Sequence, residues 1–265
     1  MKRKSGEPQL SYASYLRVPE LTGLQQLISD PPQHDELLFI VVHQVYELWF
    51  KQILHELDGV IASLDADQPL NAQRLLRRCI EIERVLIEQI RVLETMTPND
   101  FLRFRDRLMP ASGFQSAQFR QIEFLCGVGE AKHLDNFAVN APERDALERR
   151  LHGRSVGTAF YDLLRRQGFE LPEGEAGREQ RVRELSRIYQ QPEEHYTVYL
   201  LAESLVELDE TFTLWRLHHI TMVERIIGAR PGTGGSEGVG YLRGTLGRKF
   251  FPELWEVRST LSPLS

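Results

Sequence analysis

The stretch that most constrains the fold covers residues 34–50 and has the sequence HDELLFIVVHQVYELWF. Its apolar residues occupy nearly every side of a helix, which predicts a long buried helix over about residues 34–63. His43 stands within it, with Phe39 one turn before and Tyr46 one turn after. A buried imidazole costs free energy unless it finds a hydrogen-bond partner. For a lone buried histidine, a backbone carbonyl or a nearby side chain is the commoner partner.

Periodic apolar positions predict helices along most of the chain, and no segment alternates as a strand would. The other expected helices span about residues 71–96, 97–108, 116–125 and 195–227. Thr97-Pro98 is typical of a helix start, because threonine caps a helix and proline fits its first position. Charged short segments over about residues 140–192 indicate an inserted, solvated and peripheral helical hairpin. The expected fold class is all-α, a single helical-bundle domain over residues 1–265.

Composition narrows the functional classes. The chain has 265 residues, of which 42% are hydrophobic, and its net charge of −6 argues against binding nucleic acid. No run approaches the roughly 18–20 uncharged apolar residues that cross a bilayer, so no membrane span is expected. The basic first residues have no apolar stretch behind them, unlike a signal peptide. Two isolated cysteines, Cys79 and Cys126, fit a reduced, cytoplasmic protein.

A second histidine lies on an apolar stripe of the last predicted helix. His219 shares its face with Trp215, Met222 and Val223, each one turn away. The adjacent His218 points about 100° away, so the two rings cannot serve one site. By itself, His219 is more often a satisfied core residue than a ligand.

The chain offers little for a metal held by side chains alone. Its single Glu-x-x-His spacing, Glu130 to His133, is half of what a di-iron bundle needs, and no zinc-type cluster occurs. No Cys-x-x-Cys-His is present for covalent haem. Noncovalent haem stays open, because it fits between helices and needs one protein bond to iron, commonly from histidine. One histidine would then hold the iron and the other would stand on the opposite face.

Arg105 follows Phe101 by one helical turn, so a guanidinium shares a face with an aromatic ring. This pairing suits an amino-acid ligand, with a fork for the carboxylate beside an apolar wall. A surface arginine paired with its neighbour Asp106 is the alternative.

Residues 228–240 form a loop with six glycines directly after the helix that carries His219. The loop lacks the Gly-Lys-Ser/Thr ending of a phosphate-binding loop and the glycine spacing of a dinucleotide site. It is therefore either a plain connector or a flap over a site. In a flap, backbone N–H groups and the Thr233 hydroxyl would hold a small polar ligand.

Several motifs in a fixed order resemble those of one family. They are HDELLFIVVHQ (34–44), FRD (104–106), SGFQS (112–116), RIIG (225–228) and GTGGS (232–236). On these motifs the chain resembles tryptophan 2,3-dioxygenases over about residues 11–257, most weakly in the charged middle. The resemblance implies an all-helical homotetramer with one noncovalent haem b per subunit. It also implies insertion of O₂ across the C2–C3 bond of the L-tryptophan indole to give N-formyl-L-kynurenine, the first step of the kynurenine pathway.

The resemblance also implies roles for individual residues. His219 corresponds to the proximal iron ligand, and His43 to the distal, catalytic histidine that accepts a hydrogen bond from the indole N–H. A neutral imidazole can accept that bond and a protonated one cannot. Phe39 corresponds to the residue stacking on the indole, Arg105 to the carboxylate clamp, and Thr233 to the loop residue that helps hold the ammonium and carboxylate.

Further correspondences concern the edges of the site. Ser112 and Gly113 match positions near the haem. The segment containing Tyr12, Tyr15 and Leu16 matches part of an N-terminal arm, about residues 1–20, that reaches a neighbouring subunit's pocket. Phe101 stands where some members carry a tyrosine that contacts the substrate carboxylate, so recognition here must rely more on Arg105 and Thr233.

Two rival functions remain compatible with these residues. One is a related haem enzyme acting on a different indole, such as an indoleamine dioxygenase-like activity. The other is a non-catalytic helical haem-binding module that has kept the fold. Arg105 and Thr233 favour an α-amino acid substrate over other indoles.

Overall fold

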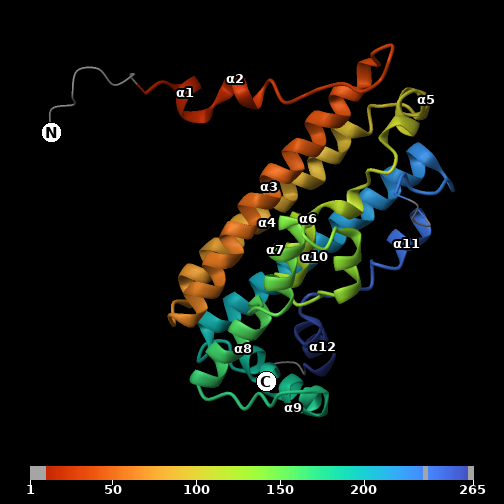
Figure 1. Cartoon of the computed structure of the whole chain (residues 1–265). Helices are drawn as coiled ribbons and strands as arrows, with labels where there is room; N and C mark the ends of the chain where they lie inside the picture. Colours follow the sequence, from red (N-terminus) through yellow and green to blue (C-terminus); the bar gives the residue numbers. More distant parts are fainter. Residues whose placement is uncertain (1–9, 235–237, 262–265) are drawn as a thin grey trace, which may run out of the picture.

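The computed structural model describes residues 10–234 and 238–261, and every regular element in them is a helix, as predicted (Figure 1). Three long helices dominate: α3 (His34–Asp65), α4 (Pro69–Leu93) and α10 (Tyr196–Ile227). The shorter elements are α1 (Tyr12–Leu16), α2 (Val18–Leu21), α5 (Pro98–Leu102), η1 (Arg105–Leu108), η2 (Gly113–Gln115), α6 (Ala117–Leu125), η3 (Ala131–Asn136), α7 (Pro142–Leu151), α8 (Val156–Arg166), η4 (Glu175–Gly177), α9 (Arg178–Gln190), α11 (Val239–Arg243) and α12 (Pro252–Thr260).

Helix α4 lies between α3 and α10 and makes the centre of the bundle (Figure 1). Its stripe of fully buried side chains includes Leu76, Ile80 and Leu86, at the three- and four-residue spacing of one helix face. Burying each such side chain stabilises the fold by roughly 1.5–3 kcal/mol. The stripe also contains Glu83, which is only 1% exposed. A carboxyl group in this position is unusual, because glutamate is rarely fully buried unless it is paired.

Helix α10 ends where the sequence predicts, at Gly228. This residue has φ 59°, in the left-handed region that glycine adopts without a steric penalty. The glycine loop begins there, and its residues 235–237 lie outside the described part of the chain.

The predicted helix over residues 97–108 is wrong in its second half. Its start is as expected, because Thr97 caps α5 by accepting a hydrogen bond from the Asp100 N–H and Pro98 takes the first position. The helix ends at Leu102, and the chain turns so that Phe104 is buried. A 3₁₀ turn follows, ending before Pro110, whose ring disfavours helical backbone in the preceding residue.

The charged stretch over residues 140–192 forms α7, α8 and α9, and the expectation that it is peripheral is wrong for its apolar faces. Phe160, Leu163 and Leu164 on α8 and Leu185 on α9 are fully buried in the main core. Charges dominate the composition of these helices and suggested a solvated surface. Their apolar residues nevertheless recur on one face, and that face packs into the main core.

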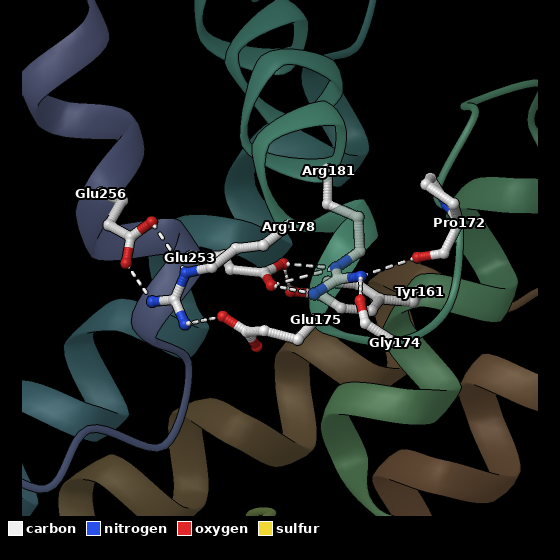
Figure 2. Close-up of polar contacts among 8 residues, drawn as sticks. All are labelled: Tyr161, Pro172, Gly174, Glu175, Arg178, Arg181, Glu253 and Glu256. Carbon is white, nitrogen blue, oxygen red and sulfur yellow. Dashed lines mark hydrogen bonds and ion pairs between the residues drawn. The ribbon is translucent and has the colours of Figure 1, made fainter.

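An ion-pair cluster ties this region to the last helix (Figure 2). Arg181 on α9 donates to the Glu253 carboxylate on α12 at 2.6–3.0 Å, and to the carbonyl oxygens of Pro172 and Gly174 at 2.7 Å. Tyr161 on α8 donates to the same carboxylate at 2.5 Å. Buried charges require such full pairing. The cluster therefore holds α8, α9 and α12 together at the end of the bundle opposite α5 and α11 (Figure 1).

Helix α3 departs from the expectation of burial on every side, because Leu37, Val41 and Leu48 are 47%, 39% and 50% exposed. Within the described residues, α3 is also the one helix long and apolar enough to cross a membrane. Core helices pass the same test. Its C-terminal half packs into the main core through residues such as Phe50 and Ile53.

Candidate active site

A cavity of about 310 Å³ lies among α3, α5, α6, α10 and the loop that follows α10. Ligand pockets commonly measure roughly 300–1,000 Å³ and have mostly apolar walls. The cavity brings together side chains from positions far apart in the chain. The predicted site residues that line it are Phe39, His43, Phe101, Arg105, Ser112, Gly113, His219 and Thr233.

His43 presents one ring nitrogen to the protein. Its Nδ1 lies 2.7 Å from the carbonyl oxygen of Phe39, one turn earlier on α3. A carbonyl can only accept, so Nδ1 carries the proton and Nε2 has the free lone pair of a neutral imidazole. The expectation that His43 is buried is wrong, because the residue is exposed where it lines the cavity. Desolvation by the protein atoms around the ring still lowers the pKa of His43 below its usual 6.5. The routine backbone partner thus satisfies one nitrogen and leaves the other as an acceptor.

His219 lies on α10 and its ring stacks on Trp215, with ring centroids 5.3 Å apart and planes only 7° from parallel. Desolvation, together with a smaller effect of the charge on His43, lowers the pKa of His219 to about 4. A metal-binding imidazole must be neutral, and this one is neutral throughout the physiological range. In the described part of the chain, no three His, Cys, Asp or Glu side chains gather as a metal site would. A lone imidazole suits a metal that brings its own equatorial ligands, as haem iron does.

One wall of the cavity, from α6 and α10, carries buried charge that the sequence did not reveal. Arg120 and Arg216 are 5% and 4% exposed, and both pair with Glu123, at 2.6 and 3.3 Å. Nε of Arg120 is buried, and no residue in the described part of the chain forms a hydrogen bond with it. Two guanidiniums sharing one carboxylate suit an anionic ligand, and haem brings two carboxylates. A sequence signal was hard to find, because Glu123 and Arg216 are 93 residues apart.

Arg105 stands at the edge of the cavity, with its side chain 11% exposed. One of its Nη atoms donates to the carbonyl oxygen of Pro231 in the glycine loop. Its contact with Asp106 is a long one, at 3.5 Å, and Nε is buried with no partner among the described residues. The Arg105 guanidinium therefore links the segment of α5 and η1 to the glycine loop. It also keeps N–H donors available for a ligand. Phe101 is buried beside Phe39, with ring centroids 5.7 Å apart.

The described part of the glycine loop lies on the segment that precedes α6. The Thr233 hydroxyl donates to the carbonyl oxygen of Ala111 at 2.7 Å. Gly234 approaches Ser112 so closely that an added Cβ would lie 2.6 Å from the Ser112 Cβ. Ser112 in turn caps η2 and precedes Gly113. These contacts favour a flap that closes on the cavity over a plain connector.

The remaining predicted residues lie away from the cavity. Tyr12, Tyr15 and Leu16 are on α1, where they are 79%, 72% and 44% exposed. Figure 1 shows α1 and α2 extending away from the bundle. Within one chain they contribute nothing to this site.

Comparison with known proteins agrees with these motifs. The family model described as tryptophan 2,3-dioxygenase matches residues 2–160 and 181–261, leaving a gap inside the charged middle region. A curated relative named tryptophan 2,3-dioxygenase from a Nocardioides species is 47% identical over 96% of this chain and 95% of its own length. Relatives of the same name from Herpetosiphon aurantiacus and Myxococcus xanthus are 44% and 43% identical over 95% and 96% of this chain, covering 98% and 90% of their own lengths. The chain belongs to the tryptophan 2,3-dioxygenase family.

Proposed function

We propose that this protein inserts O₂ across the C2–C3 bond of the L-tryptophan indole to give N-formyl-L-kynurenine, in a haem-dependent reaction. The observation that carries the proposal is a pair of neutral imidazoles, His43 and His219, that line one apolar cavity with a guanidinium at its edge. Family membership supports the same activity.

The residues present fit a noncovalent haem b. His219 would hold the iron, with Trp215 stacked against its ring. Arg120 and Arg216 would compensate the haem carboxylates, and Ser112 and Gly113 lie on the same cavity. When bound, haem would supply the iron at which O₂ is held and activated.

The protein's own contribution is to place the indole and keep it dry. His43 Nε2 accepts the indole N–H, because Nδ1 is already committed to the Phe39 carbonyl. Phe39, whose ring centroid lies 4.1 Å from that of His43, offers a face for the indole ring. Phe101 extends this apolar wall and has no hydroxyl for the substrate. Such placement lowers the barrier by fixing the reactants in a productive geometry.

The polar end of tryptophan is recognised at the cavity edge. Arg105 binds the carboxylate, and its bond to the Pro231 carbonyl couples this clamp to the loop. The Thr233 hydroxyl has a free lone pair while it donates to Ala111, so it can accept from the ammonium group. Recognition of an α-amino acid follows from this pair.

We further propose that residues 1–265 act as one domain within a cytoplasmic homotetramer, in which the arm of about residues 1–20 reaches a neighbouring subunit's site. The exposed Tyr12, Tyr15 and Leu16 on the projecting α1 support this, because large apolar side chains exposed together on one short helix are typical of an interaction surface. Residues 1–9 of the arm lie outside the described residues.

An absorption spectrum of the purified, haem-supplied protein tests the proposal. We expect a Soret band that shifts when L-tryptophan is added to the reduced form, with O₂ consumed as N-formyl-L-kynurenine appears. A haem spectrum without a tryptophan response would favour a non-catalytic module. Turnover of other indoles in preference to L-tryptophan would favour an indoleamine dioxygenase-like enzyme.

The free Nε2 of His43 predicts an acid limit to activity. Protonation removes the lone pair that accepts the indole N–H, and desolvation lowers the pKa of His43 below 6.5. Activity should therefore persist through neutral pH and fall only below about 6.5, the usual histidine value. The measurement is kcat/KM for L-tryptophan against pH. The residual activity of His43→Ala should lack this limb and that of His34→Ala, altered on an exposed ring of the same helix, should keep it. The same limb in His43→Ala would refute the assignment.

The close approach of Gly234 to Ser112 predicts that Gly234→Ala loosens the loop. An added methyl group overlaps the Ser112 side chain, so the loop must move away from the cavity. We expect KM for L-tryptophan to rise by about 5–150-fold, which corresponds to the roughly 1–3 kcal/mol that overpacking typically costs. The matched control is Gly240→Ala, because nothing lies within 4 Å of a Cβ there. Equal KM values in the two variants would show that the contact has no role in binding.

A further inference from the structure

Glu83 is a buried carboxyl group that the proposed reaction does not use. It lies in the apolar stripe of α4 and is 1% exposed. Neither carboxyl oxygen has a hydrogen-bond partner in the described residues. Desolvation raises the pKa of Glu83 to about 8, against a smaller opposing effect of Arg216. The carboxyl group is therefore protonated at neutral pH and can both donate and accept.

A second buried polar group without a well-formed hydrogen bond lies on α10, the helix that packs against α4. Among the described residues no acceptor meets good hydrogen-bond geometry with the buried Nε1 of Trp215, and the Tyr46 hydroxyl is a candidate acceptor near it. Tyr46 on α3 links the two groups. Its ring centroid is 6.2 Å from that of Trp215, and its hydroxyl donates to the carbonyl oxygen of Leu86, one turn after Glu83 on the same face of α4. The Trp215 N–H lowers the pKa of Tyr46 and the Glu83 charge raises it, although desolvation by burial has the largest effect and raises it.

We propose that Glu83, Tyr46 and Trp215 form a polar triad in which the Glu83 carboxyl group is a positioning residue for the Trp215 indole and, through the ring stack, for His219. The Tyr46 oxygen donates to Leu86 and keeps its lone pairs for the Trp215 N–H or the Glu83 O–H. Ionised Glu83 has only acceptors and competes with Tyr46 for the indole N–H. The consequence for His219 rests on the proposed haem function, whereas the triad itself does not.

Other ionisable groups lie on the elements packed around Glu83, and their titration must be distinguished from that of Glu83. They are Tyr46 on α3, Cys79 on α4, Cys126 after α6 and Arg216 on α10. Burial raises the pKa of Tyr46 and of both cysteines above their usual values, and arginine keeps its proton at any relevant pH. Glu83 is therefore the group in this set that titrates between pH 7 and 9.

The test follows the three tryptophans of the chain by ¹⁹F NMR after labelling with 5-fluorotryptophan. The full chain is used as purified, with any haem in the diamagnetic ferrous carbonyl form. We expect the Trp215 signal to shift with a midpoint near pH 8, and the shift to vanish in Glu83→Gln. Trp255 is an internal control, because its N–H is held by Asp209 at 2.9 Å. A Trp215 signal that does not titrate, or that titrates equally in Glu83→Gln, overturns the triad.

A matched variant and a haem-based measurement complete the test. Glu56→Gln removes another buried carboxyl, one that pairs with Arg78 at 2.8 Å, and should leave the Trp215 midpoint unchanged. In haem-loaded protein, the iron–histidine vibration should shift in Glu83→Leu and return to its original frequency in Glu83→Gln. An unchanged vibration in Glu83→Leu would refute transmission to His219. If the protein binds no haem, the proposed function fails while the fluorine titration still decides the triad.

Stability provides an independent check with a definite sign. The unfolded carboxyl ionises near pH 4.5, whereas the folded one keeps its proton to about pH 8. The unfolded state thus binds fewer protons between these values, and wild-type stability falls as pH rises through this window. The urea midpoint of the wild type should fall relative to that of Glu83→Gln between pH 5 and 8. Parallel midpoints would mean that Glu83 is ionised in the folded protein and would refute the protonated triad.

Discussion

His219→Ala is expected to lose tight haem binding and dioxygenase activity together. Two histidines line the cavity, and His219 is the one whose ring stacks on Trp215. Haem iron needs one protein ligand, which His219 would supply. The loss of haem affinity and activity should exceed the roughly 10–100-fold loss that follows removal of a residue supporting a metal ligand, because here the ligand itself is removed. Haem content after gel filtration and the axial-ligand spectrum are the measurements.

The neighbouring histidine provides the control for this substitution. His218 is exposed and points away from His219, so His218→Ala should keep haem and activity. Added imidazole should restore part of the haem spectrum in His219→Ala, because it can enter the space that the side chain leaves. Normal haem content with an unchanged axial spectrum in His219→Ala would disprove the assignment.

Arg105→Ala is expected to lower kcat/KM for L-tryptophan far more than kcat/KM for tryptamine, which lacks the carboxylate. A charge-assisted pair at a largely buried guanidinium loses about 2–4 kcal/mol when one partner is removed, or ~30–1,000-fold in kcat/KM. With tryptamine the clamp has nothing to bind, so only the lost contact with the Pro231 carbonyl remains. The ratio of kcat/KM for the two substrates measures how much recognition of the carboxylate contributes.

Arg103→Ala is the matched control, because this arginine is exposed two residues earlier on the same segment. It should leave the ratio of the two substrates unchanged. Equal losses for L-tryptophan and tryptamine in Arg105→Ala would show that Arg105 only supports the loop. Phe101 makes the experiment sharper, because the position has no hydroxyl that could replace the clamp.

Most helix positions followed from the sequence. The helix expected over residues 34–63 is α3, His34–Asp65, and that expected over residues 195–227 is α10, Tyr196–Ile227. Such bounds depend on local features, namely apolar periodicity, proline at helix starts and Gly228 at a helix end. The helix expected over 97–108 failed at Phe104, where burial of one ring in the core outweighed local propensity. The packing of α8 was likewise missed because composition concealed its apolar face.

The cavity residues divide in the same way. Motif order identified His43, His219, Arg105 and Thr233, and the structure brings all four to one cavity. No motif indicated Arg120 and its shared carboxylate, because a buried ion pair looks in the sequence like any exposed charge. The same holds for Glu83, because nothing in the sequence distinguishes it from an exposed glutamate.

The sequence by itself determined the helices, their order and the family, because these depend on residues within a few turns of one another or on motifs that need no coordinates. Only the tertiary structure decided what each polar atom can still do. Among the residues that it describes, it leaves Nε2 of His43 free, joins Arg105 to Pro231 across 126 residues, and encloses Glu83 without a partner. The physical reason is desolvation. The protonation state and the hydrogen-bonding capacity of a side chain depend on the atoms that replace water around it, and in this bundle those atoms come from distant helices.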